Sequence, residues 1–320
     1  MTVVAVTGAA GFLGRALASE LAARKNDVVS VVRERKSALF VRSGISDTRL
    51  VGEINLSTDW SVALHGVEVI VHCAARAHVM RDHAVDPLAL YREINVQGTR
   101  RLAEQAVDSG VRRLVFLSSV KAAGERSVLD KPLQIADNPA PEDAYGISKF
   151  EAEQTLMEVS ARTGLEVVII RPPLVYGPGV KGNFLRLLRL VARGFPLPLG
   201  SVHNARSMVY LDNLVDFLCT CVASPAAAGR TFFISDGEDL STTELILALA
   251  AAMGRPARLL PVPAHILGLL GRVTGRSAEI ERLIGTLQVD ISPNLELGWA
   301  PPFSVETGLQ ETVKWFKSQR

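Results

Sequence analysis

The chain opens with TVVAVTGAAGFLG at residues 2–14. The valine-rich beginning predicts a short buried strand, and the residues after the glycines predict a helix over residues 12–24. In such a turn Gly8 permits the sharp change of direction, Gly11 lets the backbone approach a pyrophosphate at the helix N-terminus, and Gly14 permits close packing of helix on strand. The stretch therefore predicts a dinucleotide-binding unit, with a plain strand-to-helix turn as the alternative.

A second strand is expected over residues 28–32 and ends at Arg33. An acidic residue here would bind the adenosine ribose 2′-hydroxyl, but the chain has a basic one, which suits a 2′-phosphate. The position therefore favours NADP over NAD. Two alternatives stay open: Arg33 belongs to a solvated run of charge, or Glu34 reaches the ribose and NAD is bound.

Strands continue to alternate with helices, which predicts a doubly wound parallel sheet. Further strands are expected at residues 49–54, 67–72, 112–117 and 166–170, and helices at residues 60–64, 91–109 and 145–163. Ligands of such sheets bind beyond the carboxyl ends of the strands. Ala74–Ala75, Ser118–Ser119 and Arg171–Pro173 each follow a strand, so we expect them to line one crevice with the glycine turn.

The composition changes after Pro173 and indicates a smaller α/β lobe. We expect a loop at 175–179, helices at 184–193, 242–253 and 304–317, a helical region at 265–284 and a strand at 258–262. Residues 208–211 and 231–234 are expected to return to the main sheet. The predicted division is a dinucleotide-binding domain of residues 1–173 plus 207–236, and a substrate-binding lobe of residues 174–206 plus 237–320.

Tyr145 and Lys149 stand four residues apart within the predicted helix 145–163. This spacing places both side chains on one face, about one turn apart. A free tyrosine titrates near pH ~10, and a neighbouring ammonium lowers that value toward the pH at which proton transfer is most effective. The pair therefore predicts a proton donor and its modulator; an exposed helix pair is the alternative.

The composition excludes several classes of protein. Hydrophobic residues make up 48% of the chain and 35 basic residues nearly balance 33 acidic ones, so a packed globular protein is expected and nucleic acid is not. Cys73, Cys219 and Cys221 are too few for a disulfide framework or zinc site, so no metal is expected and the cysteines suit a reducing cytoplasm. We recognise no signal peptide and no stretch long enough to insert into a membrane.

Several motifs in order resemble the extended short-chain dehydrogenases/reductases. They are Thr7-Gly8-x-x-Gly11-x-x-Gly14, Asn95, Ser118-Ser119, Tyr145-x-x-x-Lys149, Arg171-Pro172 and Leu297-Gly298-Trp299. Within these, the chain resembles the NAD(P)-dependent sugar-nucleotide epimerase/dehydratase family from about residue 2 to 317. The resemblance implies a Rossmann domain, a nicotinamide cofactor and a nucleotide-sugar substrate.

The resemblance also implies roles for individual residues. Ser119, Tyr145 and Lys149 are expected to be catalytic, with Ser118 as the alternative to Ser119. The expected cofactor contacts are Gly8, Ala10, Gly11, Phe12, Leu13, Gly14, Arg33, Glu53, Ile54, Ala74, Ala75, Asn95, Ser118, Tyr145, Lys149 and Pro172. The expected substrate contacts are His78, Ser119, Lys121, Asn183, Arg206 and Arg282, the last two because an arginine fork suits phosphate oxygens.

The chain departs from the epimerase pattern around the serine loop. Ala123 replaces a usual aromatic residue, and Lys121 occupies a position that is normally small or hydroxylic. These changes argue against simple UDP-glucose epimerisation, and Arg33 favours an NADPH-dependent reductase. The chain most resembles bacterial surface-polysaccharide (O-antigen, lipopolysaccharide) enzymes that reduce UDP-4-keto-6-deoxy-N-acetylhexosamines, which implies that substrate. The alternative is a UDP-glucose or UDP-GlcNAc 4-epimerase with tightly bound NAD. A dehydratase is disfavoured because Val120-Lys121 replaces an Asp-Glu pair, and a non-catalytic nucleotide sensor would be expected to lack Tyr145 or Lys149. Family analogy implies a homodimer through residues 91–109 and 145–163.

Overall fold

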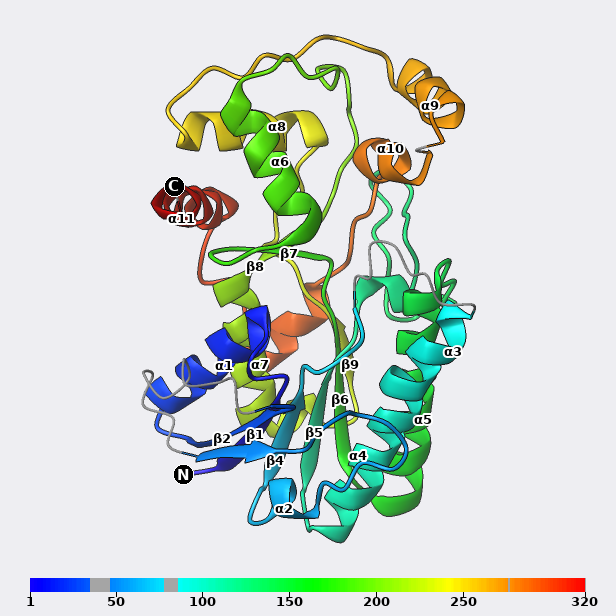
Figure 1. Cartoon of the computed structure of the whole chain (residues 1–320), viewed down its shortest axis with the longest axis vertical. Helices are drawn as coiled ribbons and strands as arrows, with labels where there is room; N and C mark the ends of the chain where they lie inside the picture. The colour runs from blue at the N-terminus through cyan, green and yellow to red at the C-terminus, as the bar shows by residue number, and fades with distance from the viewer. Residues whose placement is uncertain (35–46, 78–85, 276, 320) are drawn as a thin grey trace.

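The computed structural model describes residues 1–34, 47–77, 86–275 and 277–319 (Figure 1). Seven strands form a parallel sheet in the order β3-β2-β1-β4-β5-β6-β9. Their bounds are β1 Val3–Thr7, β2 Asp27–Val32, β3 Asp47–Leu50, β4 Val69–His72, β5 Arg113–Leu117, β6 Glu166–Arg171 and β9 Thr231–Phe233. The order reverses between β1 and β4, and ligands of such sheets bind at this point, beyond the carboxyl ends of the strands. The predicted doubly wound Rossmann sheet is confirmed.

The central strands are buried on both faces, which explains their nearly continuous apolar sequence. Val4 and Val6 of β1 and Val69 and Val71 of β4 are all 0% exposed. The predicted third strand, 49–54, is shifted: β3 ends at Leu50, and the chain then turns through Gly52 at a φ of +69°.

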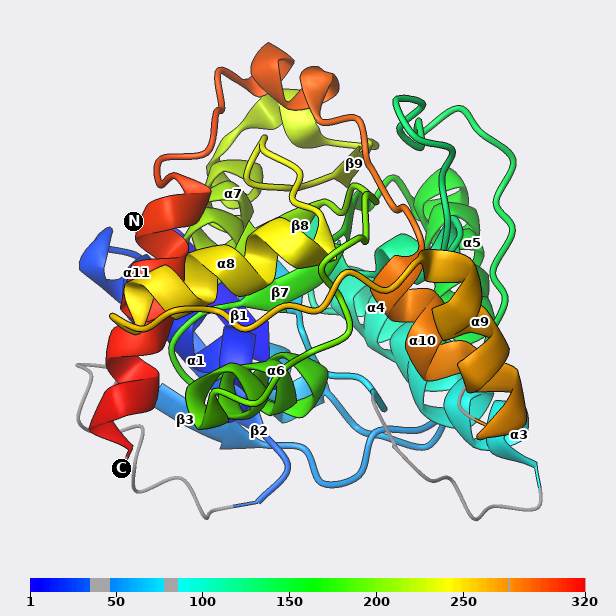
Figure 2. The same ribbon diagram turned by 90° about the horizontal axis from the view of Figure 1, so that it is seen from above.

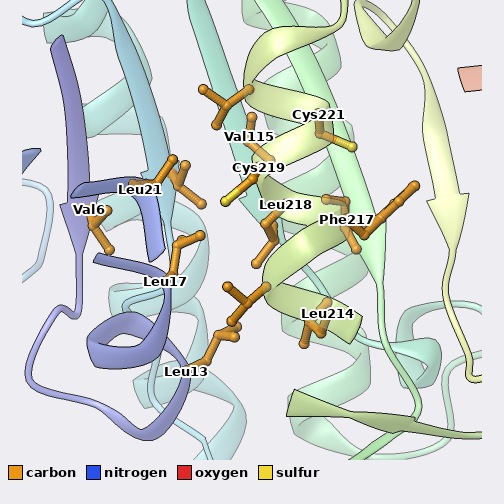
Figure 3. Packing of buried hydrophobic residues seen from close by; sticks show 14 of the residues in the cluster. Val6, Leu13, Leu17, Leu21, Val115, Leu214, Phe217, Leu218, Cys219 and Cys221 are labelled. Carbon is orange, nitrogen blue, oxygen red and sulfur yellow. The ribbon is translucent and has the colours of Figure 1, made fainter. Parts of the chain in front are cut away.

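Helices α1 (Phe12–Ala23) and α7 (Leu211–Ala223) cover one face of the sheet. Leu13, Leu17 and Leu21 of α1 lie in the same buried cluster as Leu214 and Leu218 of α7, and the two sets point toward each other (Figure 3). The sequence did not predict α7. α7 begins directly after the strand Met208–Tyr210, and the apolar sequence across this boundary gives no signal of where the helix begins.

The other face is covered by α2 (Ser61–Leu64), α4 (Gly98–Asp108) and α5 (Ala144–Thr163). The single helix expected over residues 91–109 is in fact three connected segments. They are α3 (Pro87–Tyr91), a π-helical turn η2 (Arg92–Gln97) and α4. α4 and α5 lie side by side (Figure 1).

A second apolar cluster lies above the sheet, among α6 (Gly182–Arg193), α8 (Thr242–Ala252) and α11 (Val305–Ser318). It also contains β7 (Leu174–Tyr176) and β8 (Met208–Tyr210), which pair with each other in parallel. Residues 208–211 were therefore wrongly expected to return to the main sheet; residues 231–233 do return, as β9. Phe12 packs against the cluster between α1 and α7 and also against the cluster above the sheet, so it links the two parts of the molecule.

The last part of the chain differs from expectation in two places. The expected strand at 258–262 is a loop that touches residues 197–201 through isolated bridges, because Pro261 and Pro263 lack the N–H groups a ladder requires. The helical region 265–284 is two helices, α9 (Ala264–Val273) and α10 (Ser277–Ile284), separated near Gly275 at a φ of +66°.

Short 3₁₀ turns complete the fold: η3 (Val120–Ala122), η4 (Pro225–Ala227) and η5 (Ser292–Leu297). Among the residues described, no helix combines the length and apolar character needed to cross a membrane.

Candidate active site

The glycine turn lies between β1 and α1 at the point where the strand order reverses. Gly8 has a φ of +67°, and a Cβ added to it would come within 2.9 Å of the Ala74 amide nitrogen. A Cβ on Gly14 would lie 2.3 Å from the Gly8 carbonyl oxygen. Gly11 is the N-cap of α1, and within the described residues no side chain caps that helix. The free N–H groups and the bare backbone fit the pyrophosphate of a dinucleotide.

The three other residues expected at this turn differ in exposure. Ala10 is exposed beside Gly11, whereas Leu13 is 8% exposed and lies in the core. Phe12 is half-buried, and its ring lies 3.4 Å from a Cβ added at Gly179. Leu13 can therefore reach a cofactor only through its backbone.

The residues expected around the adenosine lie at the end of β2. An Arg33 Nη1 atom is 3.6 Å from a Glu53 carboxylate oxygen, and these side chains are 65% and 73% exposed. Ile54 is 8% exposed, and a Cβ added to Gly98 would lie 2.6 Å from its side chain. Arg33 is thus accessible to a ribose phosphate, and Glu53 competes for its charge.

A buried polar chain fixes the ends of β1 and β4. The Thr7 hydroxyl lies 2.7 Å from His72 Nδ1, and the Thr99 hydroxyl lies 3.2 Å from His72 Nε2. Thr7 also accepts a 3.3 Å hydrogen bond from the Ala74 N–H. Burial lowers the pKa of His72 to about 3, so the imidazole is neutral at neutral pH. This row of hydrogen-bonded side chains holds the half-buried Ala74–Ala75 segment beside the glycine turn.

Asn95, in the π-helical turn, is 2% exposed and bonded to two neighbouring segments. Its amide accepts from the Arg76 N–H at 2.9 Å and donates to the Arg76 carbonyl at 3.1 Å. It also donates to the Ser148 hydroxyl at 2.9 Å, and Ser148 lies between Tyr145 and Lys149. Asn95 therefore ties the loop after β4 to the helix that carries the predicted catalytic pair.

Tyr145 lies in the first turn of α5, next to the serine loop. Its hydroxyl is hydrogen-bonded to Ser119, which lowers its pKa, but burial and the nearby Asp143 carboxylate dominate and raise the pKa above its ordinary value. The ring of Tyr91 lies 6.0 Å from the Tyr145 ring, centroid to centroid. Of the two candidate serines, Ser119 is the one that the structure brings to Tyr145.

Lys149 lies one turn further along α5 and is 1% exposed. Its ammonium is 4.0 Å from the centroid of the Phe116 ring. Burial lowers the pKa of Lys149 to about 7, against the opposing effect of the Glu153 carboxylate. Near neutral pH the protonation of Lys149 is therefore sensitive to the charge of a bound ligand.

Ser118 and Arg171 face inward instead of lining the crevice as expected. The Ser118 hydroxyl donates to a Glu153 carboxylate oxygen, and Arg171 Nη2 donates to the other oxygen at 2.6 Å. All three side chains are buried. Sequence reasoning missed Glu153, although its position, four residues after Lys149 on the same helix face, was a usable signal.

Pro172 and Lys121 also have partners within the protein. The Pro172 carbonyl accepts a 2.9 Å hydrogen bond from the Val120 N–H. Lys121 forms ion pairs with Glu125 at 2.8 Å and with Asp143. Asp143 in turn caps α5 by accepting from the Gly146 N–H at 2.7 Å. In this structure Lys121 is held at the start of α5, beside Tyr145.

The expected substrate contacts from the upper lobe are only partly assembled. Arg206 donates to the Gly285 carbonyl at 3.0 Å. Burial and the Arg282 charge lower the pKa of Arg206, and Glu125 opposes this effect. Asn183 is exposed at the start of α6, where its amide oxygen accepts from Arg186 at 3.3 Å. His78 lies outside the described residues.

A parallel sheet with a glycine turn at its switch point, and a Ser–Tyr–Lys cluster at its carboxyl edge, define a nicotinamide-dependent enzyme. Within that class, the chain belongs to the NAD dependent epimerase/dehydratase family, whose model matches residues 4–235. The resemblance seen in the sequence is thereby confirmed. Among the residues described, no group of histidine, cysteine, aspartate and glutamate side chains could hold a metal ion.

Two curated relatives and one solved structure match almost the whole chain. A UDP-glucose 4-epimerase of Vibrio cholerae is 47% identical, covering 98% of this chain and 95% of its own. An N-acetyl-α-D-glucosaminyl-diphospho-ditrans,octacis-undecaprenol 4-epimerase of Escherichia coli O157:H7 is 28% identical, with 98% and 94% covered. The structure of MoeE5 in complex with UDP-glucose and NAD has a TM-score of 0.74 and 26% identity, with 99% of both chains covered.

Proposed function

We propose that the protein is a UDP-sugar 4-epimerase that works with bound NAD. The observation that carries the proposal is the nearly full-length match at 47% identity to the Vibrio cholerae UDP-glucose 4-epimerase. The MoeE5 complex, which contains UDP-glucose and NAD, supports the same cofactor and substrate class. The glycine turn fits the pyrophosphate, and Ser119, Tyr145 and Lys149 lie at the same edge of the sheet.

The residues divide the proposed reaction between a hydride site and a proton site. A nicotinamide bound at the glycine turn would supply the hydride acceptor and donor for C4 of the sugar. Tyr145, as the phenolate, would take the proton from the C4 hydroxyl as the C–H bond breaks and return it when the hydride comes back, so protons and electrons balance. Ser119 hydrogen-bonds both Tyr145 and the reacting oxygen.

The charges around Tyr145 determine how readily it gives up its proton. Burial and Asp143 both favour the neutral phenol, so the enzyme needs positive charge nearby to lower the pKa. Lys149 is one source, and the charge of an oxidised nicotinamide is another. Lys121 neutralises Asp143 through its ion pair and weakens the opposing effect. Removal of the Tyr145 proton therefore depends on a bound, oxidised nicotinamide.

The upper lobe would bind the diphosphate of the substrate. Arg206 and Arg282 lie close enough to lower the pKa of Arg206, and a diphosphate would offset that repulsion. Asn183 at the start of α6 is a further candidate contact. The division into residues 1–173 plus 207–236 for the dinucleotide and residues 174–206 plus 237–320 for the sugar nucleotide is part of this proposal.

Two alternatives share the same catalytic residues. The NADPH-dependent 4-ketoreductase, for which the sequence analysis argued, uses only the second half of the reaction, and the relatives favour it less than the epimerase. A sugar diphosphate linked to a polyprenol is another substrate class, supported by the Escherichia coli relative. A reductase would release its cofactor after each turnover, whereas an epimerase retains it.

The first test combines nucleotide extraction with a Tyr145→Phe variant. The purified protein should release stoichiometric NAD on denaturation and interconvert UDP-glucose with UDP-galactose, or UDP-GlcNAc with UDP-GalNAc, without added reductant. The variant removes the proton-transfer group, so the rate should fall by about 10²–10⁴-fold while the NAD content stays unchanged.

Chromatography of the nucleotide sugars and of the extracted nucleotide measures both quantities. Near-normal turnover by the variant would exclude Tyr145 as the proton-transfer group. Turnover of a UDP-4-keto-6-deoxy sugar at the expense of NADPH, without any epimerisation, would establish the reductase instead.

A further inference from the structure

One face of α9 is apolar and has no partner among the described residues. Ile266, Leu269 and Val273 are 42%, 61% and 78% exposed, and their spacing of three and four residues places them in one stripe, called here the α9 stripe. The opposite side of the helix faces the protein, since Leu267 is 4% exposed. In both whole-chain views α9 lies at the edge of the molecule with α10 on its inner side (Figures 1 and 2).

The segments that lead to this stripe and form it carry basic residues and no acidic ones, whereas the neighbouring helix α10 carries Glu279 and Glu281, of which Glu281 pairs with Arg126 at 3.1 Å. Residues 167–211 contain six lysines and arginines, residues 245–278 contain four, and neither range contains an aspartate or glutamate. The whole chain is nearly balanced, with 35 basic and 33 acidic residues, so these two segments are richer in positive charge than the rest, although Arg171 is buried in an ion pair with Glu153. Such an asymmetry indicates an anionic partner.

The two acid-free segments meet on the upper surface. The Leu197 N–H donates to the Arg258 carbonyl and the Leu260 N–H to the Leu197 carbonyl, both at 2.8 Å. Two further apolar side chains are exposed in these loops, Phe195 at 61% and Leu260 at 50%. Among the residues described, the exposed arginines of these two segments are Arg186, Arg189, Arg193, Arg255, Arg258 and Arg272. Figure 2 shows the loops and α9 from above.

We propose that this surface docks the enzyme on a lipid bilayer containing anionic lipids, with α9 lying in the plane of the headgroups. Exposed apolar side chains beside exposed arginines are the pattern of an interfacial helix: the apolar residues enter the headgroup–acyl boundary and the arginines bind phosphates. The charge selects an anionic lipid surface over a neutral one. Docking would bring α10, with Arg282, close to the headgroups.

The proposal concerns adsorption to one surface of a bilayer and is independent of the catalytic assignment. It can hold whether the substrate is a UDP-sugar or a lipid-linked sugar diphosphate, and whether or not the reaction is an epimerisation. Its test therefore measures binding and not turnover.

The test is sedimentation of the full chain with large vesicles of two compositions. Vesicles of phosphatidylcholine with about one third phosphatidylglycerol should retain the protein, whereas pure phosphatidylcholine should retain at least about tenfold less. Binding should weaken as salt is raised, because the Debye length shortens. A Leu269→Ser, Val273→Ser double variant should bind the anionic vesicles at least about tenfold more weakly.

Val62→Ser is the matched control, since Val62 is 74% exposed on α2, away from this surface. It should bind like the parent, and circular dichroism should show that both variants are folded. Equal binding to both vesicle types, no binding to either, or an unchanged double variant would overturn the proposal. A double variant whose mass in solution falls to half that of the parent would also overturn it, because the α9 stripe would then join two copies of the chain.

Discussion

His72 shows how one buried side chain determines the geometry at the edge of the sheet. It lies in β4, stacked on Phe116 with ring centroids 5.9 Å apart, and joins Thr7 to Thr99. Because both ring nitrogens have hydroxyl partners and the side chain is 1% exposed, protonation would place a charge where water cannot solvate it. The neutral side chain thus holds Thr7, whose hydroxyl accepts from the Ala74 N–H.

This environment predicts an acid-sensitive contribution to stability. Burial lowers the pKa of folded His72 from 6.5 to about 3, so between these values the unfolded chain binds a proton that the folded chain does not. Stability is therefore lost as the pH falls below 6.5, by at most about 1.4 kcal/mol per pH unit. Urea unfolding at several pH values should show that His72→Gln has a weaker dependence than the parent between pH 7 and 5.

The surface residue His65 supplies the control for this measurement. His65→Gln should leave the parent's pH dependence intact, because His65 is exposed. An identical pH dependence in the parent and the His72 variant would show that His72 takes up a proton in the folded state.

We propose that Arg33, after β2, influences which dinucleotide binds. It is accessible, and among the residues described its ion-pair partner is Glu53, 3.6 Å away on the surface, from which a 2′-phosphate would have to separate it. Arg33→Ala should therefore weaken NADP binding by about tenfold or more and change NAD binding by less than about twofold. Titration of nucleotide-free protein with both dinucleotides gives the two constants, and an equal loss for both would show that Arg33 does not distinguish them.

At the scale of elements, α5 organises the site. Asp143 caps its start, and Tyr145, Lys149 and Glu153 follow at successive turns on one face. The first two face the catalytic edge, whereas Glu153 connects the helix to the sheet through Ser118 at the end of β5 and Arg171 at the end of β6. The buried ion pair thus fixes the position of the helix that carries the catalytic pair.

Removal of one member of this buried pair should be costly. Glu153→Ala leaves Arg171 charged, 6% exposed and without its carboxylate, which should lower the free energy of unfolding by about 3–5 kcal/mol. Glu158→Ala, in the same helix, is the matched control: Glu158 is 68% exposed in its pair with Arg100, so about 0.5 kcal/mol or less is expected. Urea denaturation measures both, and equal losses would contradict the structural role of Glu153.

At the scale of the whole molecule, contacts between distant segments hold the upper part on the sheet. Asp236, just after β9, accepts from the Tyr176 hydroxyl, the Tyr210 N–H and the Asn213 amide, each at 2.7 Å. Gly308 of α11 packs so closely that a Cβ on it would lie 2.7 Å from the Tyr176 hydroxyl. These contacts bring the end of the chain against the β7–β8 pair.

The whole-molecule prediction concerns assembly. We propose a homodimer through the exposed sides of α4 and α5, which pack against each other and leave Met157 41% exposed. Light scattering should give the mass of two chains for the parent. Met157→Glu should shift the mass toward one chain, because a carboxylate buried at the interface lacks a partner. A parent with the mass of a single chain would contradict the proposal.

The sequence by itself determined the Rossmann sheet and the location of the glycine turn and the Tyr145–Lys149 pair. These depend on local patterns: apolar runs for buried strands, glycines where a Cβ would collide, and a four-residue spacing on one helix. Tertiary structure alone decided the roles of Ser118, Arg171 and Lys121. Ser118 and Arg171 are hydrogen-bonded to Glu153, and Lys121 forms ion pairs with Glu125 and Asp143. It also decided that β8 pairs with β7 and that the chain continues as α7. The physical reason is that a local pattern fixes which face a side chain occupies, whereas its hydrogen-bond partner comes from a segment that only the folded chain brings near.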